Sequence, residues 1–349
     1  MDRSRIEEFL DRFVGFASGA TTIGLLAIAD RSGLLAWMGE HESGTAKEIA
    51  EGAGLEERYV IEIMSGLAAA GVFEYQAETQ TFTLPPEHAL FLVSETSPYF
   101  MGGWFDMVPT VMSKVDALAE ATINGGGLSF DEFGPGIVRG IDRGNAPSQR
   151  VFLVSRWLPA VPGLVDRLEA GIAAADVGCG AGTAVITMAG AFPSSQFTGF
   201  DVSEESLELA RSRSTDLPNV TFVSASVDQI PLDPPFDLIT SFDVIHDLVD
   251  PLAGLSRIRQ ALATDGMYLM MEPNASSRLE DNLDERGAML YGISVMHCMT
   301  QSLAHGGEGL GAAWGRERAA EYAKRAGFGS FRSLDDINNK FSAFYLLEP

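Results

Sequence analysis

Residues 174–182 read AADVGCGAG and form a glycine-rich loop that is followed by a second apolar run, TAVITMAGAF. Loops of this kind between a strand and a helix can hold nucleotide-like ligands, because glycine lets the backbone approach a ligand closely. The dinucleotide fingerprint G-x-G-x-x-G is broken, since Thr183 stands where its third glycine would fall. The pattern is instead D-x-G-x-G-x-G, made by Asp176, Gly178, Gly180 and Gly182.

This pattern resembles motif I of the S-adenosylmethionine-dependent methyltransferases with the seven-stranded, class I Rossmann-like fold. The resemblance implies that Asp176 meets the cationic amino group of the cofactor, directly or through water. It also implies that an acid at the end of the next strand accepts the two ribose hydroxyls, and Asp201 in FTGFDVS stands at that place. We therefore expect S-adenosyl-L-methionine as the cofactor.

The adenine contacts depart from the family pattern, in which an acid and a small residue often follow the third strand. This chain has Ser226 and Val227 there, so the contact could come from the Ser226 hydroxyl, from Asp228 or from backbone. The stretch FDLITSFDVIHDLVDP resembles the fourth-strand motif of the same family. The resulting cofactor site comprises Asp176, Gly178, Cys179, Gly180, Gly182, Asp201, Val202, Ser226, Val227 and Phe242.

The layout of the whole chain resembles the small-molecule methyltransferases of plants and of bacterial natural-product pathways, together with actinobacterial relatives of unassigned substrate. In the O-methyltransferases of that group the fourth strand ends in His followed by Asp, and this sequence reads VIHDL. The resemblance implies that His246 is a general base, and Asp247 or another acid could fix its tautomer. Methyl transfer to a neutral phenol or alcohol needs such a base, because the hydroxyl proton must leave as attack begins. The alternative is a structural role for His246 as a cap on the following turn.

Two kinds of element must position these residues. Beyond Gly171, short apolar runs alternate with amphipathic helices, which predicts a parallel α/β sheet. Its seven strands are expected at 173–177, 196–200, 220–224, 238–242, 267–272, 330–334 and 341–347, the last of them antiparallel.

The N-terminal part is expected to be all-helical with a winged helix at 40–95. Thr45 and Glu48 have the spacing of a capping box, and glycines end the two helices that follow. The stretch FEYQAETQTFTLPP alternates around a polar turn and predicts a two-stranded wing.

Two segments are candidates for the substrate pocket. Residues 99–108, YFMGGWFDMV, are too apolar for an exposed linker, which favours a flat, apolar or aromatic substrate. Residues 275–311 are expected to form helices over the sulfonium end of the cofactor, with HGGEGLG as the hinge of a mobile lid. The predicted pocket residues are Trp104, Met107, Met296 and His297.

Metal binding by His297, Cys298 and His305 is the other interpretation of this segment, because histidine and cysteine are metal ligands. No C-x-x-C or repeated pair accompanies them, so we expect no metal site.

The formal charge of −24 disfavours nucleic acid and anionic membranes as partners. The second helix of the winged helix carries Glu56, Glu57 and Glu62 against the single Arg58, which disfavours DNA binding further. The two cysteines and the charged first 20 residues favour a reduced, cytoplasmic protein without a signal peptide or membrane span. The apolar positions of the N-terminal helices favour a homodimer.

We expect three parts: a dimerisation domain at 1–95, a helical connector at 96–165 that covers the active site, and a cofactor domain at 166–349. The expected activity is methyl transfer to a small hydroxyl-bearing molecule. Methyl transfer to nitrogen or carbon of a small molecule remains an alternative, as does a winged-helix regulator that senses the cofactor.

Overall fold

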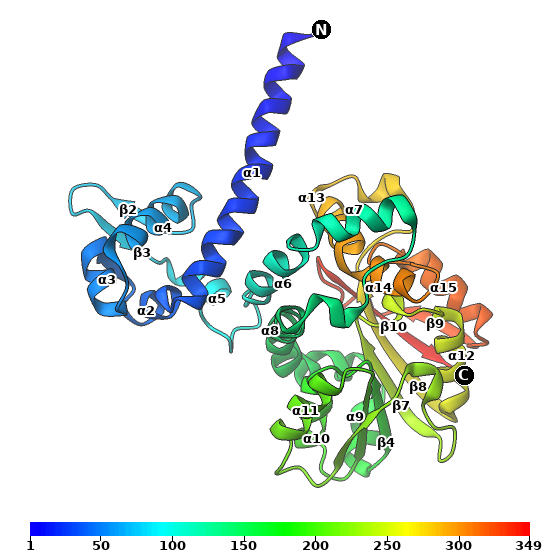
Figure 1. Cartoon of the computed structure of the whole chain (residues 1–349). Helices are drawn as coiled ribbons and strands as arrows, with labels where there is room; N and C mark the ends of the chain where they lie inside the picture. The colour runs from blue at the N-terminus through cyan, green and yellow to red at the C-terminus, as the bar shows by residue number, and fades with distance from the viewer. The chain divides into compact units, whose positions relative to one another are not determined.

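The computed structural model describes residues 1–349, which form two compact units. Unit 1 comprises Met1–Thr110 and Arg139–Pro147, and unit 2 comprises Val111–Val138 and Ser148–Pro349. Figure 1 traces the chain from blue at the N-terminus to red at the C-terminus. The expected connector 96–165 is therefore divided between the two units.

Unit 1 contains the winged helix that the sequence predicts. The Thr45 hydroxyl accepts a hydrogen bond from the backbone N–H of Glu48, and the Glu48 carboxylate accepts one from the backbone N–H of Thr45, at 3.3 and 2.8 Å. The wing is three-stranded, in the order β1-β3-β2, because a short strand that the sequence pattern did not reveal pairs Gly44 with Phe82. The elements are α2 (Leu34–His41), β1 (Ser43–Thr45), α3 (Ala46–Ala53), α4 (Glu57–Ala69), β2 (Glu74–Gln76) and β3 (Thr81–Thr83).

The first helix, α1 (Arg3–Arg31), is exposed over most of its length. Its buried residues, Leu26, Ala27 and Ala29, lie near its C-terminal end and pack into the core of the winged helix. By length and composition alone α1 could cross a membrane, although the charges at its start had favoured a chain without a membrane span. A single such helix near the N-terminus is weak evidence for a membrane span.

A buried acid joins three helices within unit 1. Asp106 forms ion pairs with Arg143 at 2.9 Å, with Arg31 at 3.3 Å and with Arg139 at 3.6 Å. Arg143 also pairs with Asp30 at 2.8 Å. These contacts connect α1 with α6 and with the part of α8 that belongs to unit 1.

The helices between the winged helix and the sheet are short or interrupted. The long α8 contains Pro147 and continues into a π-helical turn, η2. The elements are α5 (Pro86–Leu92), α6 (Gly103–Met112), α7 (Val115–Asn124), η1 (Phe130–Phe133), α8 (Pro135–Phe152), η2 (Leu153–Trp157), η3 (Leu158–Ala160) and α9 (Leu164–Ala170).

Unit 2 contains a seven-stranded sheet of order β6-β5-β4-β7-β8-β10-β9, which confirms the predicted fold class. Strand β10 is antiparallel to both of its neighbours, and the pairs from β6 to β8 are parallel. All seven predicted strands are present, although β8 begins at Leu262 rather than at Met267. The strands are β4 (Ala173–Val177), β5 (Gln196–Asp201), β6 (Val220–Ser224), β7 (Phe236–Phe242), β8 (Leu262–Pro273), β9 (Ser330–Ser333) and β10 (Ser342–Glu348).

Helices of unit 2 connect these strands and cap the sheet. The segment after β8 is helical, as predicted, and includes a second π-helical turn, η7. The elements are α10 (Thr183–Ala191), α11 (Glu204–Arg213), η4 (Val227–Gln229), η5 (Ile245–Asp247), α12 (Pro251–Ala261), η6 (Leu279–Asn282), α13 (Glu285–Ile293), η7 (Ser294–Cys298), α14 (Met299–Ala304) and α15 (Gly315–Arg325).

Strand β4 lies inside the sheet, between β5 and β7. The chain leaves β4 toward β5 on one side, whereas β7 lies on the other side, so the strand order reverses at this point. In open parallel sheets a ligand binds at the carboxyl ends of the strands where the order reverses. The glycine-rich loop follows β4 and the His246 turn follows β7, so the fold brings the two predicted motifs to neighbouring strand ends.

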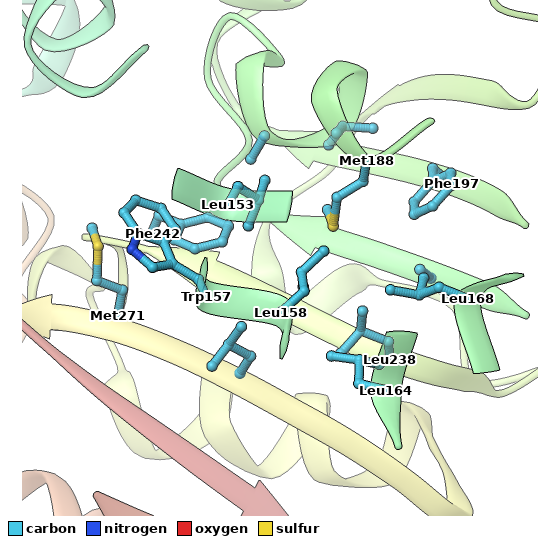
Figure 2. Close-up of a cluster of buried hydrophobic side chains, with 14 of the residues drawn as sticks. Leu153, Trp157, Leu158, Leu164, Leu168, Met188, Phe197, Leu238, Phe242 and Met271 are labelled. Atoms are coloured by element: carbon cyan, nitrogen blue, oxygen red, sulfur yellow. The ribbon is translucent and has the colours of Figure 1, made fainter. Parts of the chain in front are cut away.

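Two clusters of buried side chains pack against the sheet. Figure 2 shows the first cluster, in which Trp157 lies next to Phe242 with the ring centroids 5.8 Å apart. The second cluster surrounds Tyr268 and Trp314, which are almost completely buried.

We predict that Asn219 stabilises unit 2. Its side-chain N–H groups donate to the backbone carbonyls of Ala189, Phe192 and Ser195 at 3.0, 3.3 and 3.1 Å, and the residue is buried. Asn219→Ala leaves these carbonyls without that donor, so the free energy of unfolding should fall by about 1–3 kcal/mol. Chemical denaturation measures this, with Asn124→Ala at an exposed helix end as the control. Equal stability of the two variants would contradict the prediction.

Candidate active site

The glycine-rich loop turns sharply between β4 and α10. Gly178, Gly180 and Gly182 have φ values of 67°, 52° and 77°, a backbone region that favours glycine. A Cβ at Gly178 would lie 2.6 Å from Val244, and one at Gly182 would lie 2.8 Å from Ala210. At positions 178 and 182 other side chains of the protein fill the space that a Cβ would need, and the contact of these glycines with a cofactor stays a prediction. Only Gly180 faces open space.

Asp201, at the end of β5, holds the loop in place. One of its carboxylate oxygens accepts a hydrogen bond from the backbone N–H of Gly180, and the other accepts one from the backbone N–H of Ser203, both at 2.8 Å. Burial raises the pKa of this carboxyl. A carboxylate has about four acceptor positions, so Asp201 can also accept ribose hydroxyls.

Asp176 lies one residue before the end of β4 and is almost completely buried. It is paired with Gly199 of β5 and with Thr240 of β7, and the Thr240 hydroxyl donates to its carboxylate at 2.6 Å. Burial raises the pKa of Asp176 to about 7. A nearby cation would favour the ionised form of this carboxyl.

The other predicted cofactor residues differ in how their side chains are placed. Val202 is 68% exposed, and the Ser226 hydroxyl donates to Asp228. The side chains of Val227 and Phe242 lie in the two core clusters. Cys179 is buried, and its backbone N–H donates to the carbonyl of Phe200 at 3.0 Å, which fixes the loop to β5. The contact of each of these residues with a cofactor stays a prediction.

His246 lies in the short turn η5 after β7 and is 3% exposed. Its Nδ1 atom is 2.6 Å from Oε2 of Glu272, which is itself buried at the end of β8. The same carboxylate accepts hydrogen bonds from the indole N–H of Trp314 at 3.0 Å and from the backbone N–H of Ile245 at 2.9 Å. Glu272 therefore fixes the orientation of the imidazole ring, with Nδ1 as the donor.

The other ring nitrogen of His246 faces Asp247 and Cys298. Nε2 is 3.2 Å from Oδ1 of Asp247, a buried oxygen atom that makes no hydrogen bond. A ring nitrogen of His246, a carboxylate oxygen of Asp247 and the Cys298 Sγ atom all lie within 4.8 Å of one another. Burial lowers the pKa of His246, but the carboxylates of Asp247 and Glu272 outweigh burial and raise it well above its ordinary value.

The segment that was expected to act as a lid holds the His246 turn through backbone contacts. The N–H of Gly311 donates to the carbonyl of His246 at 3.2 Å, and the N–H of Glu308 donates to the carbonyl of Val249 at 3.1 Å. The Ser302 hydroxyl donates to the carbonyl of Leu248 at 2.8 Å. The position of the imidazole therefore depends on residues 302–311 as well as on β7.

The predicted substrate residues fall in different units. In unit 2, His297 is buried with its ring edge-on to Phe133, and the two ring centroids are 5.1 Å apart. Burial lowers the pKa of His297. Met296 is half-buried. In unit 1, Trp104 packs against the core of the winged helix, and Met107 is half-buried beside α8. Their contact with a substrate stays a prediction.

Three residues of this site were not predicted from the sequence. Glu272 and Trp314 contact His246 or its partner, and Asp243 lies buried just before the turn with φ of 59°, its pKa raised by burial to about 7. An acid at the end of a buried strand, as in MYLMMEP, was the available signal for Glu272.

Two family models match the chain. Residues 168–326 match a methyltransferase domain, and residues 19–94 match an Rv2258c-like winged helix-turn-helix domain. These matches confirm the predicted methyltransferase domain and the predicted winged helix.

Similarity to curated proteins covers only part of their length. An uncharacterised 37.1 kDa protein of transposon Tn4556 from Streptomyces fradiae is 35% identical over 132 residues, which are 37% of this chain and 38% of that protein. The chain thus spans less than half of the first curated relatives that it matches.

Solved structures share the fold over nearly the whole chain. The mitomycin 7-O-methyltransferase MmcR is 19% identical with a TM-score of 0.73, covering 99% of both chains. Human N-acetylserotonin methyltransferase, solved in complex with S-adenosylmethionine, is 18% identical with a TM-score of 0.70, covering 100% of this chain and 98% of that one. These likenesses show that the chain shares the fold of the two enzymes.

We predict that cofactor affinity depends on the ionisation of Asp176. Its pKa of about 7 means that it gains its negative charge, and its attraction for the amino group of S-adenosylhomocysteine, as the pH rises from 6 to 8. The affinity should rise by up to about tenfold over this range, because the ionised fraction rises from about one tenth to about nine tenths. Calorimetry at both pH values measures this.

The matched control is Asp176→Asn, which removes the titrating group but keeps its size. This variant should bind weakly at both pH values with little difference between them. An affinity of the wild-type protein that stays constant from pH 6 to 8 would contradict the assignment of Asp176 to the amino group.

Proposed function

We propose that this chain, a methyltransferase with an N-terminal winged-helix domain, transfers the methyl group of S-adenosylmethionine to a hydroxyl oxygen of a small molecule. The observation that carries the proposal is a buried imidazole, held by a buried carboxylate, at the strand end next to the glycine-rich loop. In this proposal His246 is the general base and Glu272 its positioning residue.

The chemistry follows from the orientation of the ring. The raised pKa of His246 favours the imidazolium, so only the neutral ring can act as the base. In the neutral ring Nδ1 donates to Glu272, and Nε2 is the atom that can take the proton of a substrate hydroxyl. A hydroxyl that donates to Nε2 replaces the close contact of Nε2 with Asp247. The two carboxylates then stabilise the imidazolium that forms as the oxygen attacks the methyl group in line with sulfur.

The chain's own acids would hold the cofactor. Asp201 accepts the ribose hydroxyls, Asp176 attracts the amino group, and the space at Gly180 admits the ligand close to the backbone. S-adenosylmethionine supplies a sulfonium methyl group, and the buried acids near both strand ends favour such a cationic ligand.

The nature of the substrate rests on the predicted pocket residues. Met296, which lies in unit 2 together with His246, is large and apolar, and this favours an apolar or aromatic acceptor such as a phenol. A nitrogen acceptor needs no base if its lone pair is free, so the contribution of His246 distinguishes O-methylation from N-methylation.

DNA binding by the winged helix is disfavoured. Arg58, the one basic residue of α4, forms an ion pair with Glu62 of the same helix, so α4 presents no free positive charge to a phosphate. This argues against a regulator that senses the cofactor. Both cysteines are free and buried, which fits a cytoplasmic enzyme.

We also propose that α1 pairs with a second copy of this chain. Ile6, Phe9, Phe13 and Phe16 recur at helical spacing and are 51–66% exposed, so they form one apolar stripe. Charged residues of both signs, including Glu8 and Arg12, are interspersed with the stripe. Charges are costly in a lipid bilayer but suit the rim of a helix–helix interface, which favours a second copy over a membrane.

The test of the catalytic proposal is His246→Gln. This variant should bind S-adenosylhomocysteine nearly as tightly as the wild type, while the methylation rate should fall by roughly two to four orders of magnitude, the usual contribution of a general base. The assay follows the transfer of tritium from the labelled cofactor to a panel of phenols, hydroxylated polyketides and amines.

Glu272→Gln tests the positioning role, since it keeps the size of the side chain but loses the charge. Its rate should also fall, and the pH profile of kcat should shift, which a purely structural role would not produce. If His246→Gln stays within about threefold of the wild-type rate on the best phenolic acceptor, His246 is not the base.

The dimer proposal predicts a mass of two chains by light scattering at micromolar concentration. Replacing Phe9 and Phe13 together by Asp should give a monomer, because charged side chains would be buried in the interface. Glu7→Gln on the same helix is the control. A monomeric wild-type protein, or binding of the wild type to lipid vesicles through α1, would overturn the proposal.

A further inference from the structure

The side of the imidazole that faces away from Glu272 carries three atoms that can bind a metal ion. They are a ring nitrogen of His246, a carboxylate oxygen of Asp247 and Sγ of Cys298, which lie within 4.8 Å of one another, and Nε2 of His246 is 3.2 Å from Oδ1 of Asp247. The first two belong to the turn η5 after β7, and the third belongs to the π-helical turn η7. Two elements that are distant in the sequence thus contribute to one cluster.

The Asp247 oxygen has no hydrogen-bond partner although it is buried from solvent. A buried carboxylate oxygen without a donor costs free energy, and most such atoms in folded proteins are paired. A cation between Oδ1 and Nε2 would satisfy both atoms at once. The whole Asp247 side chain is 27% exposed, which gives the cluster access to solvent.

The surroundings of His246 match those of a metal-bound histidine. Such a histidine almost always donates its other ring N–H to a carboxylate or carbonyl, which fixes the tautomer and the ring orientation. Here Nδ1 is paired with Glu272, and Glu272 is held by Trp314. The nitrogen that remains for a metal, Nε2, is the one that faces Asp247 and Cys298.

We propose that His246, Asp247 and Cys298 form a binding site for Zn²⁺, and that bound Zn²⁺ inhibits methyl transfer. A set of one nitrogen, one oxygen and one sulfur ligand suits zinc, whereas Mg²⁺ and Ca²⁺ prefer oxygen ligands alone. Three protein ligands leave a fourth position for water. On binding, the Cys298 thiol releases its proton to solvent and the thiolate coordinates the metal.

Inhibition follows because Nε2 of His246 has a single lone pair for either the metal or a proton. While Nε2 coordinates Zn²⁺, it cannot accept the proton of a substrate hydroxyl. This part of the inference rests on the proposed role of His246 as the base, whereas zinc binding itself does not.

The first experiment measures binding without any reaction. The full-length protein is dialysed against Zn²⁺ and then against zinc-free buffer, retained metal is quantified by mass spectrometry, and affinity is measured against a chromophoric chelator. The wild type should retain about one zinc ion per chain. Cys298→Ser and Asp247→Asn should each weaken binding at least tenfold, because each removes one of three ligands.

The matched control is His305→Ala, which removes an exposed histidine of the same segment. It should retain zinc as the wild type does. If the wild type retains no zinc, or if Cys298→Ser and His305→Ala retain equal amounts, the site does not exist as proposed.

The second experiment measures the methylation rate with and without Zn²⁺. The rate of the wild type should fall as the site fills and should recover when a chelator is added. Inhibition of Cys298→Ser, relative to its own zinc-free rate, should need at least tenfold more Zn²⁺. An unchanged or increased rate of the zinc-loaded wild type would overturn the inhibition.

The two proposals fail separately. If zinc is retained but no hydroxyl acceptor is methylated in its absence, the proposed function fails and the zinc site stands. If methylation proceeds and depends on His246 but no zinc is retained, the zinc site fails and the proposed function stands.

Discussion

The Glu272 carboxylate is the constraint on which the candidate site depends. It is buried at the end of β8, and it binds the imidazole of His246, the indole of Trp314 and two backbone N–H groups of the turn after β7. These donors come from two parts of the chain that are far apart in sequence, residues 244–246 and Trp314. A buried carboxylate is stable only when hydrogen bonds replace its lost hydration, so the four donors and the acid must be kept together.

Other acids extend this arrangement along the ends of the central strands. Asp176 and Asp201 flank the glycine-rich loop, and Asp243 lies just before the His246 turn. Burial raises the pKa of all three carboxyls, so their ionised forms are costly without a cation nearby. A ligand with a sulfonium and an ammonium group would lower this cost, and so would a metal ion in the cluster beside His246. The same electrostatic environment thus underlies both proposals.

Local sequence patterns were sufficient to predict the elements but not the contacts between them. The strands at 173–177 and 220–224 have the predicted ends, because small or β-branched apolar runs flanked by turn residues depend little on the rest of the fold. The Thr45–Glu48 capping box is equally local. Glu272 was missed because its role depends on β7 and β8 being neighbours in the sheet. The packing of Val244 against Gly178 and of Ala210 against Gly182 could not be predicted for a similar reason, since Val244 and Ala210 come from other elements.

The division of the chain has a consequence for how such a protein could evolve. Residues 139–147 belong to the same compact unit as the winged helix, and Arg143 there neutralises both Asp30 and Asp106. A recombination event that transferred only the first 95 residues to another catalytic domain would leave Asp30 without its cation and would lose α6 altogether. The winged helix of this protein is therefore not an independent module: exchange between relatives must carry the later segment with it, or the recipient must already possess a compatible one.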